Sequence, residues 1–131
     1  MNPDTPRQQT ILIVEDETAI RKALVDSLSR EGFAILEAED GEIGLSIAME
    51  ENPDLILLDA VMPNMDGLTM LHKLHEKEEG RKIGVIMLTN LSENETVRAA
   101  MREGIYDYLV KTNWKLEDLI TKINEYLACK K

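Results

Sequence analysis

Short apolar runs recur along the chain, separated by longer segments that contain many polar residues. Each run has five or six residues and is rich in isoleucine, leucine and valine, which is typical of β-strands. The first, third and fourth runs are almost continuously apolar, as expected for a parallel sheet that helices cover on both faces. The predicted strands are residues 10–14, 34–38, 54–59, 84–89 and 106–110.

The segments between these strands carry apolar residues three or four positions apart, which predicts amphipathic helices. The pattern is clearest in the last segment, where Leu119, Ile123 and Leu127 recur at every fourth position. Ser92 and Glu95, three residues apart, match a capping box at the start of the fourth segment. The predicted helices are residues 17–30, 42–50, 68–75, 93–102 and 115–127.

Strands and helices alternate five times with short connections, which predicts an α/β domain with a parallel sheet and right-handed crossovers. Five strands suit a doubly wound sheet better than a barrel of eight. The 131 residues suffice for one domain with a full hydrophobic core. We expect this domain to span residues 10–128, between a flexible N-terminal arm (1–9) and a short tail (129–131).

Polar side chains stand at the carboxyl ends of four of the five predicted strands. Ligands of a doubly wound sheet bind beyond this edge, where side chains from neighbouring strands meet. The candidates are Glu15 and Asp16 after the first strand, Asp59 at the end of the third, Thr89 and Asn90 at the end of the fourth, and Lys111 after the fifth. We therefore expect one polar cluster at one edge of the sheet.

The expected cluster combines three carboxylates with an ammonium and a hydroxyl group. Carboxylates held together repel one another, and a hard divalent cation with oxygen ligands relieves this repulsion. Mg²⁺ is the expected ion, with Mn²⁺ as its substitute. Metal, ammonium and hydroxyl groups can each bind one oxygen of a phosphoryl group. A carboxylate in the middle of such a cluster can itself be the nucleophile and form an aspartyl phosphate.

Each of these residues also has an ordinary structural explanation. Asp16 is placed to cap the helix that follows it, and Asp59 is placed to cap a turn before Pro63. Lys111, taken alone, is explained by solvation. The joint pattern favours a functional role, because four of five strands end in groups that complement phosphate and metal.

The composition narrows the expected partners. The formal net charge is -10 at pH 7, so we expect neither direct nucleic-acid binding nor membrane binding.

The single cysteine, Cys129, cannot form an intrachain disulfide. Residues 1–10 lack the apolar stretch of a secretory signal, and no apolar run approaches the roughly 20 residues of a spanning helix. We therefore expect a cytoplasmic protein.

Four motifs together resemble the receiver domain of two-component response regulators, including the chemotaxis regulators. They are ILIVEDE (11–17), LILLDAVMPNMDG (55–67), IMLTN (86–90) and DYLVK (107–111). The resemblance covers about residues 10 to 128. It implies a flavodoxin-like (βα)5 fold in three layers with the strand order 2-1-3-4-5, which places the third strand, with Asp59, at the centre.

The resemblance also implies a set of residues around one Mg²⁺ ion. Asp59 matches the phosphoacceptor, which is itself a metal ligand. Asp16 matches the residue that binds the ion directly, and Glu15 matches the one that acts through water. The backbone carbonyl of Val61 matches the remaining protein ligand.

Further residues match positions that bind the phosphoryl group and transmit the signal. Thr89 and Lys111 match the residues that grip the phosphoryl group. Tyr108 matches the aromatic residue whose rotamer follows Thr89, although an aromatic on the strand surface is its structural alternative. Phosphorylation then changes the shape of the face formed by residues 93–127, which binds an output partner.

The chain departs from the family's usual pattern next to this site. Thr112 follows Lys111 where the family usually has a proline after a cis bond, so we expect a trans bond or a strained cis bond. Asn90 replaces a small residue of the phosphate and switch region and is expected to cover or narrow the phosphate site. Val61 and Leu91 occupy positions that tune dephosphorylation. Their apolar side chains are expected to hinder the attacking water and lengthen the phosphorylated lifetime.

We expect a phosphoacceptor switch of two-component phosphorelay signalling that catalyses its own phosphorylation and dephosphorylation, rather than a turnover enzyme. Its phosphoryl donor is a sensor histidine kinase, a phosphotransfer protein or a small phosphodonor. One alternative is a pseudo-receiver that acts only as a docking module. Another is a phosphatase of the haloacid dehalogenase type, but this class needs a second acid where Val61 stands.

A homodimer is a further expectation for the face formed by residues 93–127. Arg102, Asp107 and Lys122 lie on this face, where they are expected to form salt bridges between two copies. Exposed ion pairs contribute little by themselves. The sequence leaves open whether the receiver domain stands alone or forms part of a longer regulator.

Overall fold

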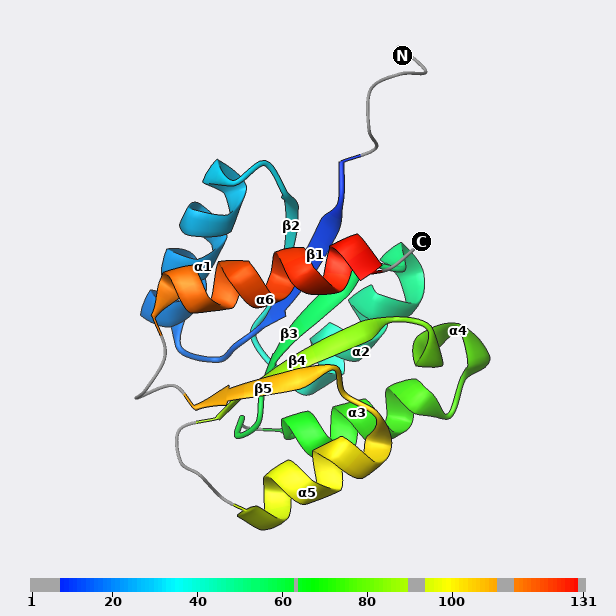
Figure 1. Ribbon diagram of the computed structural model, residues 1–131. Helices are drawn as coiled ribbons and strands as arrows, with labels where there is room; N and C mark the ends of the chain where they lie inside the picture. The colour runs from blue at the N-terminus through cyan, green and yellow to red at the C-terminus, as the bar shows by residue number, and fades with distance from the viewer. Residues whose placement is uncertain (1–7, 63, 90–93, 111–114, 130–131) are drawn as a thin grey trace.

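The computed structural model describes residues 8–62, 64–89, 94–110 and 115–129. Within these ranges, five parallel strands form one sheet in the order β2-β1-β3-β4-β5 (Figure 1). The strands are β1 (Thr10–Val14), β2 (Ala34–Ala38), β3 (Leu55–Asp59), β4 (Gly84–Thr89) and β5 (Asp107–Val110). The predicted fold and strand order are therefore confirmed, with β3 at the centre of the sheet.

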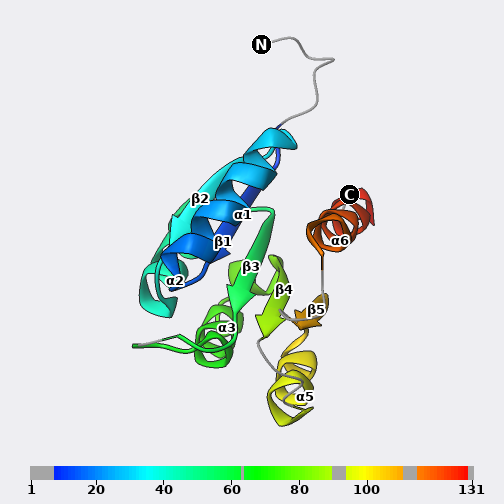
Figure 2. The ribbon, with the colours of Figure 1, turned by 90° about the vertical axis from the view of Figure 1, so that its left-hand side faces the viewer.

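Helices cover both faces of the sheet and complete the three predicted layers. Helices α1 and α6 pack on one face, and α2, α3 and α5 pack on the other (Figure 1, Figure 2). The helices are α1 (Thr18–Arg30), α2 (Gly41–Glu51), α3 (Gly67–His75), α4 (Glu78–Arg81), α5 (Asn94–Glu103) and α6 (Leu116–Cys129). In the part of the chain that the structure describes, none of the helices combines the length and apolar character needed to cross a membrane.

Alternate residues of the central strand contribute to two separate cores. Leu55 and Leu57 of β3 pack with residues of α1 and α6. Ile56 and Leu58 pack with residues of α2 and α3 on the other face. All four side chains are fully buried, which explains why this strand is apolar throughout rather than at every second position.

Two helices that begin at the carboxyl edge of the sheet, α2 and α3, start with aspartate caps. Asp40 caps α2 by accepting the backbone N–H of Ile43 at 2.9 Å, and Asp66 caps α3 in the same way. Gly44 lets α2 pack closely on β1, because a Cβ at this position would lie 2.9 Å from a methyl carbon of Val14.

The observed elements begin and end within two residues of the predicted ones, with one addition. The four-residue helix α4 has the sequence EEGR, which shows no apolar periodicity. It packs closely after α3, since a Cβ on Gly80 would lie 2.0 Å from the carbonyl oxygen of Leu74. The capping box expected at Ser92 lies outside the described residues.

Candidate metal centre

Three carboxylates meet at the carboxyl edge of the sheet. Glu15 and Asp16 follow β1, and Asp59 ends the adjacent strand β3. One oxygen atom of each carboxylate lies within 4.8 Å of the others. Glu15 is fully buried and Asp59 is 3% exposed, whereas Asp16 is half-buried. The structure thus brings the three predicted carboxylates together.

The chain folds back tightly after Asp59. The backbone N–H of Ala60 donates to the carbonyl of Leu88 at 2.9 Å, which continues the pairing with β4. The N–H of Gly67 donates to the carbonyl of Ala60 at 3.0 Å and closes the loop. A Cβ at position 67 would lie 2.3 Å from the carbonyl oxygen of Asp59. This turn therefore requires a residue without a side chain at the start of α3.

Arg21 of α1 braces the loop that carries two of the carboxylates. Its Nη1 donates to the carbonyl oxygen of Glu15 at 2.7 Å, and its Nε pairs with the carboxylate of Glu37 on β2 at 3.1 Å. The backbone N–H of Glu17 donates to Oε2 of Glu15 at 3.1 Å. Glu17 is the N-cap residue of α1, and the helix has no side-chain cap. The alternative that Asp16 serves only as the cap is therefore wrong.

Sequence reasoning did not single out Arg21, because one arginine on an amphipathic helix carries no distinctive pattern. It also missed the hydrogen bond between Asn64 in the loop after β3 and Asp40, the cap of α2. The Asp-Gly pair at the start of α2 was the available signal, since an aspartate before a predicted helix is a typical cap.

Strands β4 and β5 reach the same edge of the sheet. Their register pairs Asp59 with Leu88, and Thr89 with Val110. The backbone of Thr89 therefore lies one residue beyond the level of Asp59, and Lys111 follows β5 directly. The side chain of Thr89 lies outside the described part of the chain, and so do four whole residues: Asn90, Leu91, Lys111 and Thr112. The roles of these residues therefore stay predictions.

The donors at this edge fit a hard divalent cation. Glu15, Asp16 and Asp59 offer carboxylate oxygens, which Mg²⁺ and Mn²⁺ prefer as ligands. Two of the three carboxylates are buried, so their mutual repulsion is less screened by water than it would be on the surface. These residues are the ones that would hold the ion.

A sequence model of the response regulator receiver domain matches residues 11–124. The chain belongs to this family. The receiver domain is 42% identical to transcriptional regulatory protein SrrA of Staphylococcus aureus over 101 residues, which cover 77% of this chain and 41% of SrrA. It is 39% identical to transcriptional regulatory protein ResD of Bacillus subtilis over 108 residues, which cover 82% of this chain and 44% of ResD.

A solved structure gives the same result at the level of the fold. The CheY-like response regulator receiver domain protein from Methanospirillum hungatei superposes with a TM-score of 0.86 at 31% identity, covering 93% of this chain and 95% of that one.

The match to the receiver domain covers less than half the length of SrrA and of ResD. Because both are named as transcriptional regulators, the expectation that nucleic acid is no partner receives no support from these relatives.

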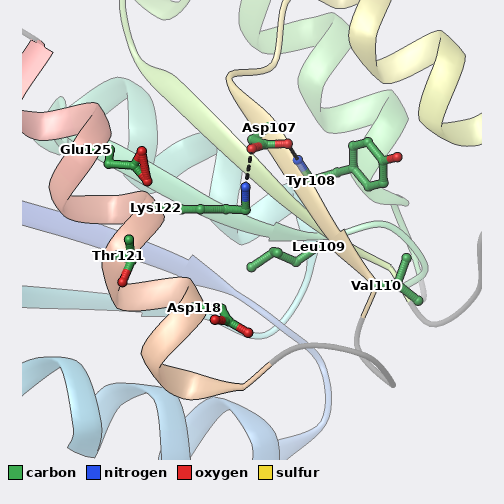
Figure 3. Close-up of a pocket in the computed structure, with 8 residues that line it drawn as sticks. All are labelled: Asp107, Tyr108, Leu109, Val110, Asp118, Thr121, Lys122 and Glu125. Carbon is green, nitrogen blue, oxygen red and sulfur yellow. Dashed lines mark hydrogen bonds and ion pairs between the residues drawn. The ribbon is translucent and has the colours of Figure 1, made fainter.

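The receiver domain carries an internal ion pair on the face where partners are expected. Nζ of Lys122 on α6 donates a hydrogen bond to Oδ2 of Asp107 on β5 at 2.5 Å. This hydrogen bond raises the pKa of Lys122. Both line a groove of about 570 Å³ between β5 and α6, and Figure 3 shows Lys122 reaching along it to Asp107. Salt bridges from these two residues to a second copy would have to replace this pair.

Tyr108 points to the opposite side of β5 from Lys122 (Figure 3). Its side chain is exposed, as expected for an aromatic residue on the strand surface. An inward rotation of Tyr108 with Thr89 stays a prediction, and so does the contribution of the exposed Arg102 on α5 to a dimer.

Helix α5 is tied to α3 by one carboxylate that lies between two imidazoles. Oε2 of Glu103 lies 3.1 Å from Nδ1 of His72, and Oε1 lies 3.6 Å from Nδ1 of His75. The hydrogen bond to Glu103 raises the pKa of His72 above its ordinary value of 6.5. The contact between α3 and α5 therefore strengthens when His72 gains a proton.

Proposed function

We propose that this receiver domain is an Mg²⁺-dependent phosphoacceptor switch in two-component signalling, phosphorylated on Asp59. The convergence of three carboxylate oxygens within 4.8 Å supports this proposal most directly. Asp59 ends β3, the central strand of the sheet. A docking surface that did not bind a metal would have no need to bury two carboxylates together.

Glu15, Asp16, Asp59 and the backbone carbonyl of Val61 are the proposed holders of Mg²⁺, which Mn²⁺ can replace. When bound, the ion neutralises charge on the carboxylates and on the incoming phosphoryl group. The chain supplies the rest by positioning. Arg21 fixes the carbonyl of Glu15, and the tight turn after β3 fixes the backbone of Asp59.

The proposed reaction transfers a phosphoryl group to the carboxylate of Asp59. One carboxylate oxygen attacks the phosphorus atom of a phosphohistidine on a sensor kinase or phosphotransfer protein. The P–N bond breaks and the imidazole leaves with the electron pair. Lys111 and Thr89 are the proposed donors that hold two of the phosphoryl oxygens, and the side chain of Asn90 is proposed to border them.

The proposed response is a shift between two arrangements of the face formed by residues 93–127. The phosphorylated side chain carries about -1.5 to -2 charges in place of the single charge of the carboxylate. Thr89 then moves toward the phosphoryl group, and Tyr108 turns inward. An output partner, or a second copy of the chain, then binds this face. Val61 and Leu91 are proposed to slow the attack of water on the acyl phosphate.

The proposed domain spans residues 10–128, and its proposed location is the cytoplasm, where it meets its kinase. The matched residues cover only 44% of ResD and 41% of SrrA. Any DNA-binding or other output of a longer protein would therefore involve residues outside the matched region. For this domain itself, the net charge of -10 opposes direct binding to nucleic acid.

Acetyl phosphate or beryllofluoride with Mg²⁺ tests the proposal on the purified chain. The native chain should gain the mass of one phosphoryl group from acetyl phosphate, and its single tryptophan, Trp114, is a candidate reporter of beryllofluoride binding. Both signals should disappear with Asp59→Asn or with EDTA. A native chain that is neither labelled nor changed would favour the pseudo-receiver that acts only as a docking module.

A further inference from the structure

The loop that follows Asp59 is tied to a neighbouring loop by one pair of side chains. Nδ2 of Asn64 donates to Oδ2 of Asp40 at 3.1 Å. Asp40 belongs to the connection between β2 and α2, and its other oxygen, Oδ1, accepts the backbone N–H of Ile43 at 2.9 Å. The carboxylate therefore caps α2 and holds the loop after β3 at the same time.

Asp40 is well suited to hold a neighbouring amide group. Asp40 is 8% exposed, so few water molecules compete for its oxygens. The backbone N–H of Ile43 lowers the pKa of Asp40, and the amide of Asn64 lowers it further against the opposing effect of burial. The acceptor is thus a carboxylate anion, which makes stronger hydrogen bonds than a neutral group.

The backbones of the two loops also fit closely together. Asn64 has a φ of 67°, in the left-handed region that asparagine tolerates better than most residues. A Cβ on Gly41 would lie 2.5 Å from the carbonyl oxygen of Met65. The hydrogen bond between Asn64 and Asp40 therefore joins two segments that already touch, with little room for either to move.

The backbone carbonyl of Val61 depends on restraints from elsewhere in the loop, because the side chain of Val61 is too exposed to fix its orientation. The two ends of the loop are fixed by the backbone hydrogen bonds of Ala60 and Gly67. Val61 is 61% exposed, so its own side chain does little to orient its carbonyl, whereas the next residue, Met62, is buried in the core. Asn64 lies three residues further along and restrains the middle of the loop.

We propose that Asp40 and Asn64 form a latch that positions the backbone carbonyl of Val61 for the metal ion. Both are positioning residues and neither contacts the ion. The inference rests on the proposed function, because it assigns the latch to the same Mg²⁺ site. It predicts that a change at Asn64 alters metal affinity without altering any ligand.

Asn64→Gly is the sharpest variant for a test. Glycine adopts the left-handed conformation without strain, so this change removes the amide group and leaves the backbone free to keep its shape. Asn52→Gly is the matched control, since Asn52 also has a positive φ, of 49°, and ends α2 away from the site. Asp40→Asn combined with Asn64→Asp reverses the hydrogen bond, keeps a capping oxygen at position 40 and preserves the net charge.

Mg²⁺ affinity is measured by isothermal titration calorimetry, and loop mobility by amide hydrogen exchange of residues 60–62 and 64–66 without metal. Asn64→Gly should weaken binding on the order of 10-fold, as for other outer partners of metal ligands, and should speed exchange in the loop. Asn52→Gly should do neither. The double variant should recover most of the native affinity.

Native-like Mg²⁺ affinity in Asn64→Gly would overturn the latch and leave the proposed function intact. Equal losses in Asn64→Gly and in the Asn52→Gly control would also overturn it, because a general loss of stability would then explain both. A native chain that binds no Mg²⁺ would instead overturn the proposed function, and the latch with it.

Discussion

Neutralising Asp59 should stabilise the metal-free protein, although the change removes a buried charge at the proposed reaction centre. Its carboxylate lies within 4.8 Å of the oxygens of Glu15 and Asp16. At that separation each pair of charges repels by roughly 0.9 kcal/mol in water and by roughly 3.5 kcal/mol at an effective dielectric constant of about 20. Asp59→Asn removes two of the three repulsions and keeps an oxygen that can accept hydrogen bonds.

The expected gain lies near the lower part of this range. Asp16 is half-buried, so solvent screens its interaction with Asp59. The predicted attraction between Asp59 and Lys111 is also lost in the variant. We therefore expect Asp59→Asn to raise the free energy of unfolding by about 1–2 kcal/mol in the absence of divalent metal.

Urea unfolding followed by circular dichroism measures this difference in EDTA and again in Mg²⁺. The native chain should gain roughly 2.7 kcal/mol when Mg²⁺ is present at about 100 times its dissociation constant, and Asp59→Asn should gain much less. Asp26→Asn is the matched control, because Asp26 is an exposed carboxylate paired with Arg30 on α1, and it should change stability by under about 0.5 kcal/mol. Lower stability of Asp59→Asn in EDTA would refute the reasoning, as would equal stabilisation of both chains by Mg²⁺.

Three further predictions concern two contacts at the site and one between α3 and α5. Gly67→Ala should destabilise the fold by about 1–3 kcal/mol and weaken phosphorylation, because the added methyl group would clash with the carbonyl oxygen of Asp59. Urea unfolding measures the stability and labelling by acetyl phosphate measures the phosphorylation. Native-like stability and labelling would contradict the tight turn. Arg21→Gln should lower Mg²⁺ affinity by loosening the carbonyl of Glu15, and calorimetry showing no change would argue against this brace. The pKa of His72 is raised in the folded protein, so its pairing with Glu103 contributes stability below pH 6.5 that is lost as the pH rises through the higher folded pKa. Glu103→Gln should therefore destabilise the protein more at pH 6 than at pH 8.5. An NMR titration in which this variant leaves the pKa of His72 unchanged would contradict the pairing.

The sequence was sufficient to predict the fold because the apolar runs indicate where the strands lie and how deeply the central ones are buried. Leu55 to Leu58 are apolar without alternation, and this follows directly from cores on both faces of β3. The acidic cluster was equally accessible, since the carboxyl ends of parallel strands share one edge. Glu15, Asp16 and Asp59 each follow an apolar run, so predicting the strands also located the cluster.

The remaining contacts depend on how loops face one another, which no periodicity encodes. Asn64 reaches Asp40 across 24 positions of sequence, and Arg21 reaches Glu37 across 16. Both pairs join polar residues that would be equally reasonable as solvated surface groups. The same holds for Lys122, which pairs within the chain although its sequence position suited a bridge between copies.

The first strand and the last helix share one core, and this constrains how the protein is made. Ile11 and Ile13 of β1 pack in the same cluster as Leu119, Ile123 and Leu127 of α6. A nascent chain presents the two isoleucines early, but α6 is synthesised only after the other helices and strands of this domain. Until α6 has left the ribosome, only α1 can cover this face of the sheet, and the apolar surface left exposed can bind chaperones or aggregate. Productive folding of this domain is therefore completed only at the end of its translation.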